Sequence, residues 1–347
     1  GVDIVDTTTT QAVEQVYRRS RTITHETLET IRPGLRAIDA NVAHEPALRW
    51  SPLRPPGDGA PLARIVETLR RELRAFRERN TLDAVVVVNL ASAEPEPADA
   101  PAQRELDALE GAIAEDRKDQ VSPAMVTAYA AFAERCPYVN FTPNLSVRCP
   151  SLQQFAASRS LPYYGDDGKT GETLVKTALG PMFACRNLHV MSWEGTNLLG
   201  NNDGRALDDA DNRVAKLRNK ASVLDSIVGY PVHSNVNIDY VPSLGDWKTA
   251  WDLVHFRGFM DVPMSLQFTW QGCDSVLAAP LILDMARLAE FAQRKGESGP
   301  MVHLAMYFKN PLEVDEMSLY PQFETLLAYA RHHLAGRDRI DAAGSRP

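Results

Sequence analysis

A run of eight residues, Asp83-Ala84-Val85-Val86-Val87-Val88-Asn89-Leu90, constrains the fold of this chain more than any other stretch. A continuous β-branched run predicts a central parallel strand that is buried on both faces. An amphipathic helix is predicted before it, over 62–79, while a helix over 121–135 and a strand over 138–143 are predicted after it. Alternating helices and strands are typical of a doubly wound α/β sheet. We therefore expect the fold class to be α/β.

Small polar residues follow both predicted strands of this first half. Ligands of doubly wound sheets bind at the carboxyl ends of the strands. The residues in that position are Asn89, Ser92, Asn140, Thr142 and Pro143. They are candidates for contact with a ligand, and turn formation explains the same residues equally well.

The glycine-rich turn of a dinucleotide-binding unit is absent from the start of the chain. No GxGxxG motif follows a strand there, and Gly200 and Gly204 lie far downstream without the strand-turn-helix context. The chain begins at Gly1 without an initiator methionine, so we expect its true N-terminus to lie upstream. Residues 10–35 have helical periodicity.

The second half predicts an open sheet in a separate α+β domain, with long connections between its strands. Apolar or alternating runs predict strands over 187–194, 232–240, 264–271 and 302–308. Helical periodicity predicts helices from 173 to about 182 and over 212–228 and 281–293. We expect three units, over residues 1–160, 161–300 and 301–347, the last returning to the first.

Composition excludes several classes of protein. The formal net charge of −8 argues against a general nucleic-acid binder, so an anionic substrate would need a local basic pocket. The cysteines lack a CxxC pair and indicate the reduced thiols of a cytoplasmic protein. No apolar run is long enough to span a membrane. The eight histidines show no HExxH or similar ligand spacing, so we expect no metal site.

The loop Lys169-Thr170-Gly171-Glu172-Thr173 precedes a predicted helix. Free backbone N–H groups and the helix dipole favour an anion at such an N-terminus, and Thr170 and Thr173 add hydroxyl donors. Glu172 counts against a phosphate there, because its carboxylate would repel one. The alternative is an ordinary helix N-cap by Thr170 with an acidic first turn.

Lysines are the second group of candidates. Lys216 and Lys220 are four residues apart and share one helical face. Paired lysines usually form a solvated surface, but in an apolar pocket they can transfer protons or stabilise an enolate oxygen. Lys309 and Asp274 follow predicted strands, and Lys248 lies in Gly245-Asp246-Trp247-Lys248. Structural ion pairs would explain each of the three singly.

In order and spacing, these segments resemble the myo-inositol-1-phosphate synthase (inositol-3-phosphate synthase) family. The resemblance covers nearly all of residues 1–312. It is carried by Gly1–Ile4, Gly165–Thr173, Leu199–Gly204, Lys216 with Lys220, Asp239–Pro242 with Lys248, Asp274–Asp284, and Lys309–Leu312.

The resemblance implies a Rossmann-type NAD domain over 1–160 and a catalytic and tetramerisation domain over 161–300. It implies conversion of glucose 6-phosphate to an inositol phosphate: C5 is oxidised with NAD, C6 loses a proton and attacks the C1 aldehyde, and C5 is reduced again. The catalytic residues implied are Lys216, Lys220, Lys248, Lys309, Asp167, Asp203 and Asp274. The substrate-binding residues implied are Thr170, Gly171, Thr173, Asn197, Asn201 and Asn202. The NAD-binding residues implied are Asp3, Asn89, Ser92, Asn140, Thr142 and Pro143.

The family pattern further implies a homotetramer, built through the sheet of the second domain, with a sugar phosphate as its small-molecule partner. Two departures from the pattern leave alternatives open. Glu172 stands where much of the family has a neutral residue, so a relative that acts on a different sugar or sugar phosphate is one alternative. The glycine-rich turn, which the family carries upstream of its GWDI segment, is absent here, so a non-catalytic homologue without cofactor is the other.

Overall fold

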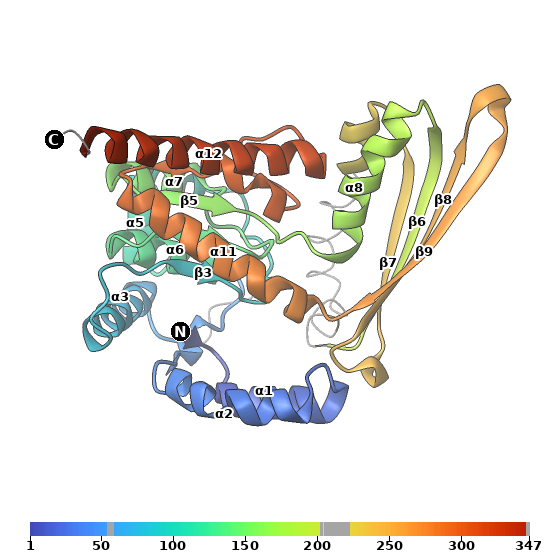
Figure 1. Cartoon of the computed structure of the whole chain (residues 1–347). Coiled ribbons are helices and arrows are strands. Elements are labelled where there is room, and N and C mark those ends of the chain that lie inside the picture. Colours follow the sequence, from blue (N-terminus) through green and yellow to red (C-terminus); the bar gives the residue numbers. More distant parts are fainter. Residues whose placement is uncertain (54–58, 202–203, 205–222, 345–347) are drawn as a thin grey trace.

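The computed structural model describes residues 1–53, 59–201, 204 and 223–344, the last ten of these by their backbone alone. It contains two four-stranded sheets that stand next to each other. Figure 1 shows the parallel sheet, covered by helices, on one side and the taller mixed sheet on the other. Helix α8 (Gly171–Cys185) stands between the two sheets, and α11 (Asp274–Arg294) runs from the mixed sheet back to the parallel one.

The parallel sheet has the strand order β10-β5-β4-β3. Helices pack on both of its faces, as a doubly wound sheet requires, with α6 on one face and α11 on the other. The α/β fold class is therefore confirmed. Its strands are β3 (Val87–Asn89), β4 (Tyr138–Asn140), β5 (Pro162–Gly165) and β10 (Gly299–Pro300). The helices on the α6 face are α3 (Leu62–Arg79), α4 (Pro101–Arg104), α5 (Leu106–Ala114), α6 (Pro123–Ala133) and α7 (Pro150–Ser158).

Helix α6 shows how the sequence produces this packing. Ser122 caps it by accepting a hydrogen bond from the Met125 amide, and Pro123 occupies the first helical position, where no N–H is needed. Its small and apolar side chains are buried on almost every side, so α6 lies inside the larger core between α3 and the sheet. Fully burying one of its larger apolar side chains, such as Met125 or Phe132, contributes about 1.5–3 kcal/mol to the stability of the fold.

The valine run forms a parallel strand, but its expected central place is wrong. Within the described residues β3 ends the sheet, and the strands that are buried on both faces are β4 and β5. Val86, Val87 and Val88 are only part-buried. The reason is that residues 85–95 border a large cavity instead of another strand. A continuous apolar run does not distinguish these two surroundings.

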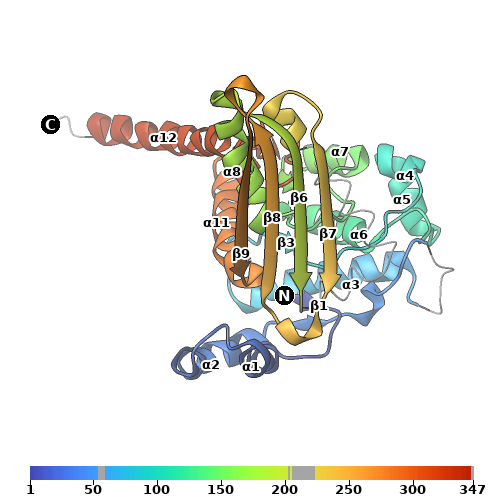
Figure 2. The same cartoon turned by 90° about the vertical axis from the view of Figure 1, so that its right-hand side faces the viewer.

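The mixed sheet has the strand order β7-β6-β8-β9, with β6 parallel to β7 and antiparallel to β8. Its strands are β6 (His189–Leu199), β7 (His233–Tyr240), β8 (Lys248–Arg257) and β9 (Pro263–Gly272). Helix α8 covers one face. In Figure 2 the opposite face lies towards the viewer, and no helix of the described residues crosses it.

Strand β8 is absent from the sequence-based prediction because polar residues interrupt its apolar alternation. Lys248 and Asp252 alternate with Ala250 and Val254 on the buried face of the sheet. Asp252 is accommodated there because the indole N–H of Trp193 donates to its Oδ1 at 2.7 Å. The buried carboxylate on its face therefore hid β8, which pairs regularly with β9 and, apart from one register shift between Val190 and Ser192, with β6.

Two other predicted elements are wrong in form. Residues 302–308, predicted as a strand, form the 3₁₀ helix η4 (Val302–Tyr307), whose three-residue period buries Leu304 and Tyr307 on one side. The single helix predicted over 10–35 is two helices, α1 (Thr9–Ser20) and α2 (His25–Asp39). The left-handed backbone of Arg21 ends α1, and the side chain of Thr24 caps α2.

The N-terminal region connects the two sheets at one end of the molecule. A short parallel pair joins β1 (Val2–Asp3) to β2 (Ala43–His44), beside the cavity next to β3. The end of α1 contacts the turn before β8, where the indole N–H of Trp247 donates to the Ser20 carbonyl at 2.8 Å and the Ser20 hydroxyl binds Asp246. The 3₁₀ helices η1 (Pro46–Leu48), η2 (Pro242–Leu244) and η3 (Phe259–Asp261) complete the connections.

The chain crosses between the sheets at different places from the expected boundaries at 160 and 300. Strand β5 pairs with β4, and α11 packs on β3, β4 and β5, so both belong with the parallel sheet. The C-terminal helix α12 (Leu319–Gly344) packs on η4 and α8. We therefore propose that the second unit spans about 170–273 and that the segment after 273 returns to the first. No described helix is long and apolar enough to cross a membrane.

Prediction: Gly168→Ala destabilises the protein by about 1–3 kcal/mol, the usual cost of overpacking. A Cβ at Gly168 would lie 2.2 Å from Cζ of Phe141, whose ring packs on Phe308. The matched control is Gly34→Ala, inside α2, where a Cβ meets nothing within 4 Å and helix propensity favours alanine. Urea denaturation at neutral pH checks both variants. Equal stabilities for the two would contradict the close contact at Gly168.

Candidate active site

The carboxyl ends of three parallel strands meet at one edge of the sheet. Asn89, Asn140 and Gly165 are direct neighbours across β3, β4 and β5. The Asn89 amide donates to Asn140 Oδ1 at 2.9 Å and to the Thr142 hydroxyl at 3.1 Å. These polar residues therefore bond to one another and fix the shape of the loops at this edge. Pro143 is buried in the same loop.

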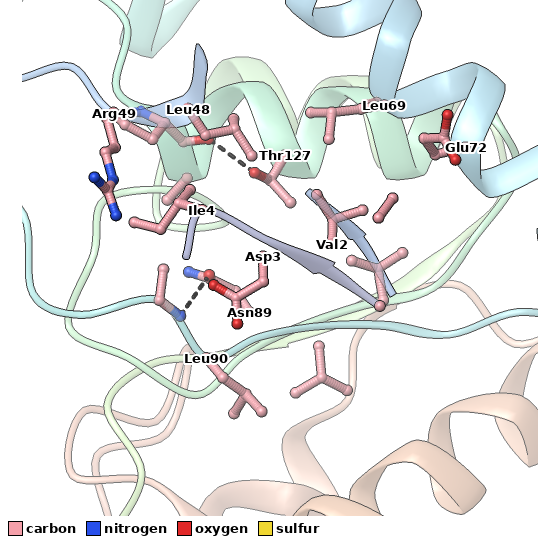
Figure 3. A pocket seen from close by; sticks show the side chains of 18 of the residues that line it. Val2, Asp3, Ile4, Leu48, Arg49, Leu69, Glu72, Asn89, Leu90 and Thr127 are labelled. Atoms are coloured by element: carbon pink, nitrogen blue, oxygen red, sulfur yellow. Dashed lines mark hydrogen bonds between the residues drawn. The ribbon is translucent and has the colours of Figure 1, made fainter. Parts of the chain in front are cut away.

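A cavity of about 1170 Å³ opens beside this edge, between β3 and the N-terminal strand. Asp3, Asn89 and Ser92 line it, whereas Asn140, Thr142 and Pro143 lie behind its wall. Figure 3 shows Asp3 and Asn89 within an otherwise largely apolar lining that includes Leu48 and Leu90. Of the six residues predicted to bind NAD, three therefore line the cavity, and the other three lie in the loops that support its wall.

The loop after β5 holds the first lysine–aspartate pair. The Lys309 ammonium lies 2.7 Å from Asp167 Oδ1, and both side chains are at most 10% exposed. Backbone hydrogen bonds join the two segments, from the Lys309 amide to the Asp167 carbonyl and from the Lys169 amide to the Tyr307 carbonyl, each at 2.7 Å. The chain after η4 therefore runs antiparallel to the loop and brings Lys309 to the carboxyl edge of the sheet.

A second pair lies at the N-terminus of α8. The Lys248 ammonium, at the start of β8, lies 3.1 Å from Asp274 Oδ2, at the start of α11. Gly171 touches this pair, because a Cβ built on it would lie 3.1 Å from the Lys248 ammonium, and its φ of +56° suits glycine. Thr170 is the N-cap residue of α8 without a side-chain capping bond. The N-terminus of α8 therefore lies beside the Lys248 ammonium.

Glu172 points into the interior instead of towards this helix end. Its Oε1 lies 2.9 Å from the Lys176 ammonium, and its Oε2 accepts a hydrogen bond from the Asn197 amide at 2.7 Å. Glu172 is 2% exposed, between α8 and β6. The repulsion between its carboxylate and an anion at the helix N-terminus, which the sequence suggested, is therefore reduced by the neighbouring Lys176.

The remaining expected residues are only partly described. Thr173 is buried in the first turn of α8, and the Asn201 side chain accepts a hydrogen bond from the Gly204 amide at 3.0 Å. Asn202, Asp203, Lys216 and Lys220 lie outside the described residues. Among the described residues, no group of three or more histidine, cysteine, aspartate or glutamate side chains is arranged to hold a metal ion.

Sequence reasoning missed two buried ionisable groups in the same loop. Asp166 is fully buried and lies 2.7 Å from the guanidinium Nε of Arg148. Burial raises the pKa of Asp166 to about 7, against the opposing effect of Arg148. Lys169 is 2% exposed and donates to the Gln322 amide oxygen at 2.7 Å. The sequence contains a signal for both residues, because the charged residues of 166–169 directly follow a buried strand and must therefore lie at an edge of the sheet.

Known proteins match this chain in sequence and in fold. A family model described as myo-inositol-1-phosphate synthase, and named as an NAD-binding domain, matches residues 1–331. The chain belongs to this family. An inositol-3-phosphate synthase from Bacteroides thetaiotaomicron is 37% identical over 301 residues, which cover 82% of this chain and 67% of that protein. An inositol-3-phosphate synthase from Drosophila melanogaster is 32% identical, over 68% of this chain and 44% of that protein.

Solved structures agree with the family assignment. An inositol-3-phosphate synthase from Caenorhabditis elegans matches with a TM-score of 0.79 and 26% identity, over 94% of this chain and 68% of that one. A myo-inositol-1-phosphate synthase-related protein from Thermotoga maritima matches with a TM-score of 0.70 and 26% identity, over 83% and 77%. The chain therefore spans between about two fifths and four fifths of the length of these relatives.

Prediction: Lys309→Met lowers the free energy of unfolding by about 3–5 kcal/mol, because it leaves the buried Asp167 carboxylate without its cation. Adding Asp167→Asn recovers part of that loss. The control is Lys248→Met, whose partner Asp274 is 26% exposed at its side chain and can be solvated by water, so we expect a loss nearer 1 kcal/mol. Urea denaturation gives all four values, and equal losses for the two lysines would refute this difference.

Prediction: Lys169 makes stability rise with pH above neutrality. Burial lowers the pKa of Lys169 to about 8, and no carboxylate of the described residues is within ion-pair distance. Between this pKa and the ordinary value of 10.5 the unfolded chain keeps a proton that the folded protein has released, so folding gains free energy as pH rises. From pH 7.5 to 9.5 wild type should gain about 2 kcal/mol relative to Lys169→Met.

Chemical denaturation at the two pH values measures this gain. The control is Lys295→Met, an exposed lysine at the end of α11, for which the difference from wild type should be the same at both. A pH-independent difference for Lys169→Met would show that Lys169 keeps its proton throughout.

Proposed function

We propose that the protein is an NAD-dependent inositol-3-phosphate synthase, which converts glucose 6-phosphate to a myo-inositol phosphate. The observation that carries the proposal is the pair of lysine–aspartate contacts, Lys309 with Asp167 and Lys248 with Asp274. The first lies in the loop that precedes α8 and the second beside Gly171 at the α8 N-terminus, and each joins segments that are far apart in the chain. Membership of the family, whose relatives carry this activity in their names, supports the same conclusion.

We propose that the α8 N-terminus holds the substrate phosphate. Backbone N–H groups that lack an intrahelical partner and the helix dipole both favour an anion there. Thr170, Gly171 and Thr173 would surround it, and the nearby Lys248 adds positive charge. Glu172 does not oppose this role, because its carboxylate is paired with Lys176 and Asn197.

The cavity beside β3 suits a dinucleotide in the chemistry of its lining. Asp3 supplies a carboxylate of the kind that binds ribose hydroxyls, Asn89 and Ser92 supply polar groups, and apolar side chains offer a wall for a flat ring. Asn140, Thr142 and Pro143 would act from behind, by holding Asn89 and its loop. When bound, NAD supplies the oxidation and the later reduction at C5 of the sugar.

The chain's own residues would carry the charge and proton steps. After C5 is a ketone, the proton at C6 is acidic, and its removal leaves an enolate whose C6 attacks the C1 aldehyde. Negative charge develops first on the C5 oxygen and then on the C1 oxygen, so lysines placed around the sugar stabilise both states. We assign this role to Lys309 and Lys248, with Lys216 and Lys220, and we assign Asp167, Asp203 and Asp274 to orienting them.

Ring closure also requires the open-chain sugar to be held with C1 near C6. Asn197, Asn201 and Asn202 are proposed to bind its hydroxyl groups for this purpose. The Asn197 amide is fixed by Glu172, which limits the positions that its carbonyl oxygen can take. Such positioning converts a flexible chain into one reactive conformer, which is the larger part of the task in an intramolecular aldol reaction.

We further propose a homotetramer that forms through the uncovered face of the mixed sheet. Alternation along β8 turns Ala250, Asp252 and Val254 towards α8 and leaves Trp251 on the opposite face, 41% exposed. A broad sheet face with an exposed tryptophan is a favourable surface for association. All four cysteines are free, and three are buried, as expected in the reducing cytoplasm, where we propose that the enzyme acts.

Prediction: the purified protein, incubated with glucose 6-phosphate and NAD⁺, produces an inositol phosphate that phosphorus NMR or mass spectrometry of the products detects. Lys220→Ala should reduce kcat by about 10²-fold or more while leaving the folded state intact, because it removes a counter-charge. Lys295→Ala, at an exposed lysine, should retain wild-type activity. Turnover of another sugar phosphate with none of glucose 6-phosphate would rule out this function, and a fully active Lys220→Ala would show that Lys220 is a surface lysine without a catalytic role.

A further inference from the structure

Arg148 lies where three loops at the carboxyl edge of the parallel sheet converge. It belongs to the loop after β4, and its side chain is 34% exposed. The guanidinium contacts Asp166 in the loop after β5 and Glu96 in the loop after β3. A third contact, to the Pro143 carbonyl at 3.3 Å, ties the side chain to its own loop. The planar, multidentate head of arginine allows one residue to make all three contacts.

The contact with Asp166 neutralises a carboxylate that water does not reach. Nε of Arg148 lies 2.7 Å from Asp166 Oδ2, and Asp166 is fully buried. Asp166 exchanges backbone hydrogen bonds with Asn310, and its neighbour Asp167 holds Lys309. A shift of Asp166 therefore moves the backbone that carries both members of the Asp167–Lys309 pair.

The other end of the contact reaches the wall of the large cavity. Nη2 of Arg148 lies 2.5 Å from Glu96 Oε1. Glu96 directly follows residues 89–95, which line the cavity. Asn144 holds the same segment, since its amide donates to the Ser92 carbonyl at 3.0 Å and its Oδ1 accepts from the Glu94 amide at 2.9 Å. Residues 91–96 are thus fastened to the loop of Arg148 at several points and cannot shift independently of it.

We propose that Arg148 is a positioning residue, which fastens the cavity-lining segment 91–96 to Asp166 and thereby sets the position of the Asp167–Lys309 pair. The inference rests on the proposed function, because the cavity is assigned to NAD and the pair to the sugar. A ligand that orders 91–96 then favours the binding-competent geometry of the lysine pair, and the two ligands bind cooperatively. No single side chain other than Arg148 contacts both acidic residues among the described residues.

The test compares Arg148→Lys with Arg148→Gln. Lysine keeps a positive charge for Asp166 but has one point of contact, so it cannot also hold Glu96 and Pro143. Glutamine removes the charge as well. The control is Arg104→Gln, which breaks an exposed ion pair between Arg104, the last residue of α4, and Asp99, which precedes that helix. The probes are NAD⁺ and glucitol 6-phosphate, an open-chain sugar phosphate without the aldehyde that the reaction attacks.

The main readout is the factor by which saturating NAD⁺ tightens binding of glucitol 6-phosphate, measured by calorimetry. In wild type and Arg104→Gln we expect roughly 5- to 150-fold, the usual range for coupled sites. In Arg148→Lys the factor should fall several-fold while the unfolding midpoint stays close to wild type, because Asn144 still holds residues 92–94. In Arg148→Gln, which also loses the charge facing Asp166, it should fall towards one, and kcat should fall by about 10²-fold. Wild-type coupling in Arg148→Lys would overturn the proposal. Loss of coupling only in proportion to lost stability would do the same.

The charge on Asp166 gives an independent check of the same contact. The charged and polar groups that face Asp166 are Arg148, Asp167, Glu96 and the Asn310 amide. The folded-state pKa of Asp166 lies above its ordinary value of 3.8, so its contribution to stability is lost as pH rises between the two. Arg148→Gln should extend this loss to pH values above 7, and Asp166→Asn in the same background should abolish it. A pH profile unchanged from wild type would contradict the contact.

A ligand-free readout separates failure of this inference from failure of the proposed function. If wild type binds no NAD⁺ and makes no inositol phosphate, the function is wrong, and amide hydrogen exchange decides the inference. Arg148→Lys should then speed exchange at the Lys169 and Lys309 amides, which bond across the loop, while Arg104→Gln leaves it unchanged. Unchanged exchange in Arg148→Lys would overturn the positioning role whatever the ligands are.

Discussion

The antiparallel pairing between the loop after β5 and the segment after η4 is the contact on which the candidate site depends. Backbone hydrogen bonds between residues 165–169 and 307–312 bring the C-terminal part of the chain to the carboxyl edge of a sheet formed by its first half. Without that pairing, Lys309 would have no reason to lie near Asp167, and the edge would carry uncompensated acids. The pairing also orders the backbone before ligands arrive, which reduces the entropic cost of binding.

The buried lysines in the described part of the site differ in their partners, and the partner determines how well the positive charge is compensated. Lys309 and Lys248 each face an aspartate, and Lys176 faces Glu172. Lys169 faces only a neutral amide oxygen, which leaves its positive charge the least compensated of the four. A pair that is satisfied holds its geometry, whereas a poorly compensated ammonium releases its proton more easily.

The sequence predicted the fold class, the helices α3, α6, α8 and α11 and three of the four strands in the mixed sheet, but not the C-terminal helix α12. Period-based patterns succeed where an element buries one face only, as in α3, or alternates regularly, as in β7 and β9. They failed at β8, where Asp252 and Lys248 are buried, and at η4, where a 3₁₀ period imitates a short apolar strand. Both failures border the candidate site, where local pattern yields to tertiary contacts.

The motif resemblance identified Asp167, Lys248, Asp274 and Lys309, and the structure joins them into two pairs. It did not identify Arg148, because no feature of the sequence around position 148 shows that three loops meet there. The residue type of Glu172 alone suggests that it repels a phosphate, but Lys176, one helical turn away, pairs with its carboxylate and reduces that repulsion. A sequence motif can indicate residues that bind a substrate directly. A residue that acts by holding other residues in place, as proposed for Arg148, can be recognised only from its contacts in the structure.

The contact between Ser20 and the turn before β8 has a mechanical consequence. The two sheets are joined by α8, by α11 and by the α1–α2 hairpin, whose Ser20 contacts Asp246 and Trp247 directly before the start of β8. The three connections meet at one end of β8, because Lys248 follows Trp247 directly and contacts both Asp274, where α11 begins, and Gly171, where α8 begins. A displacement of α1 therefore pulls on the backbone that carries Lys248, so the N-terminal hairpin is mechanically coupled to the candidate site.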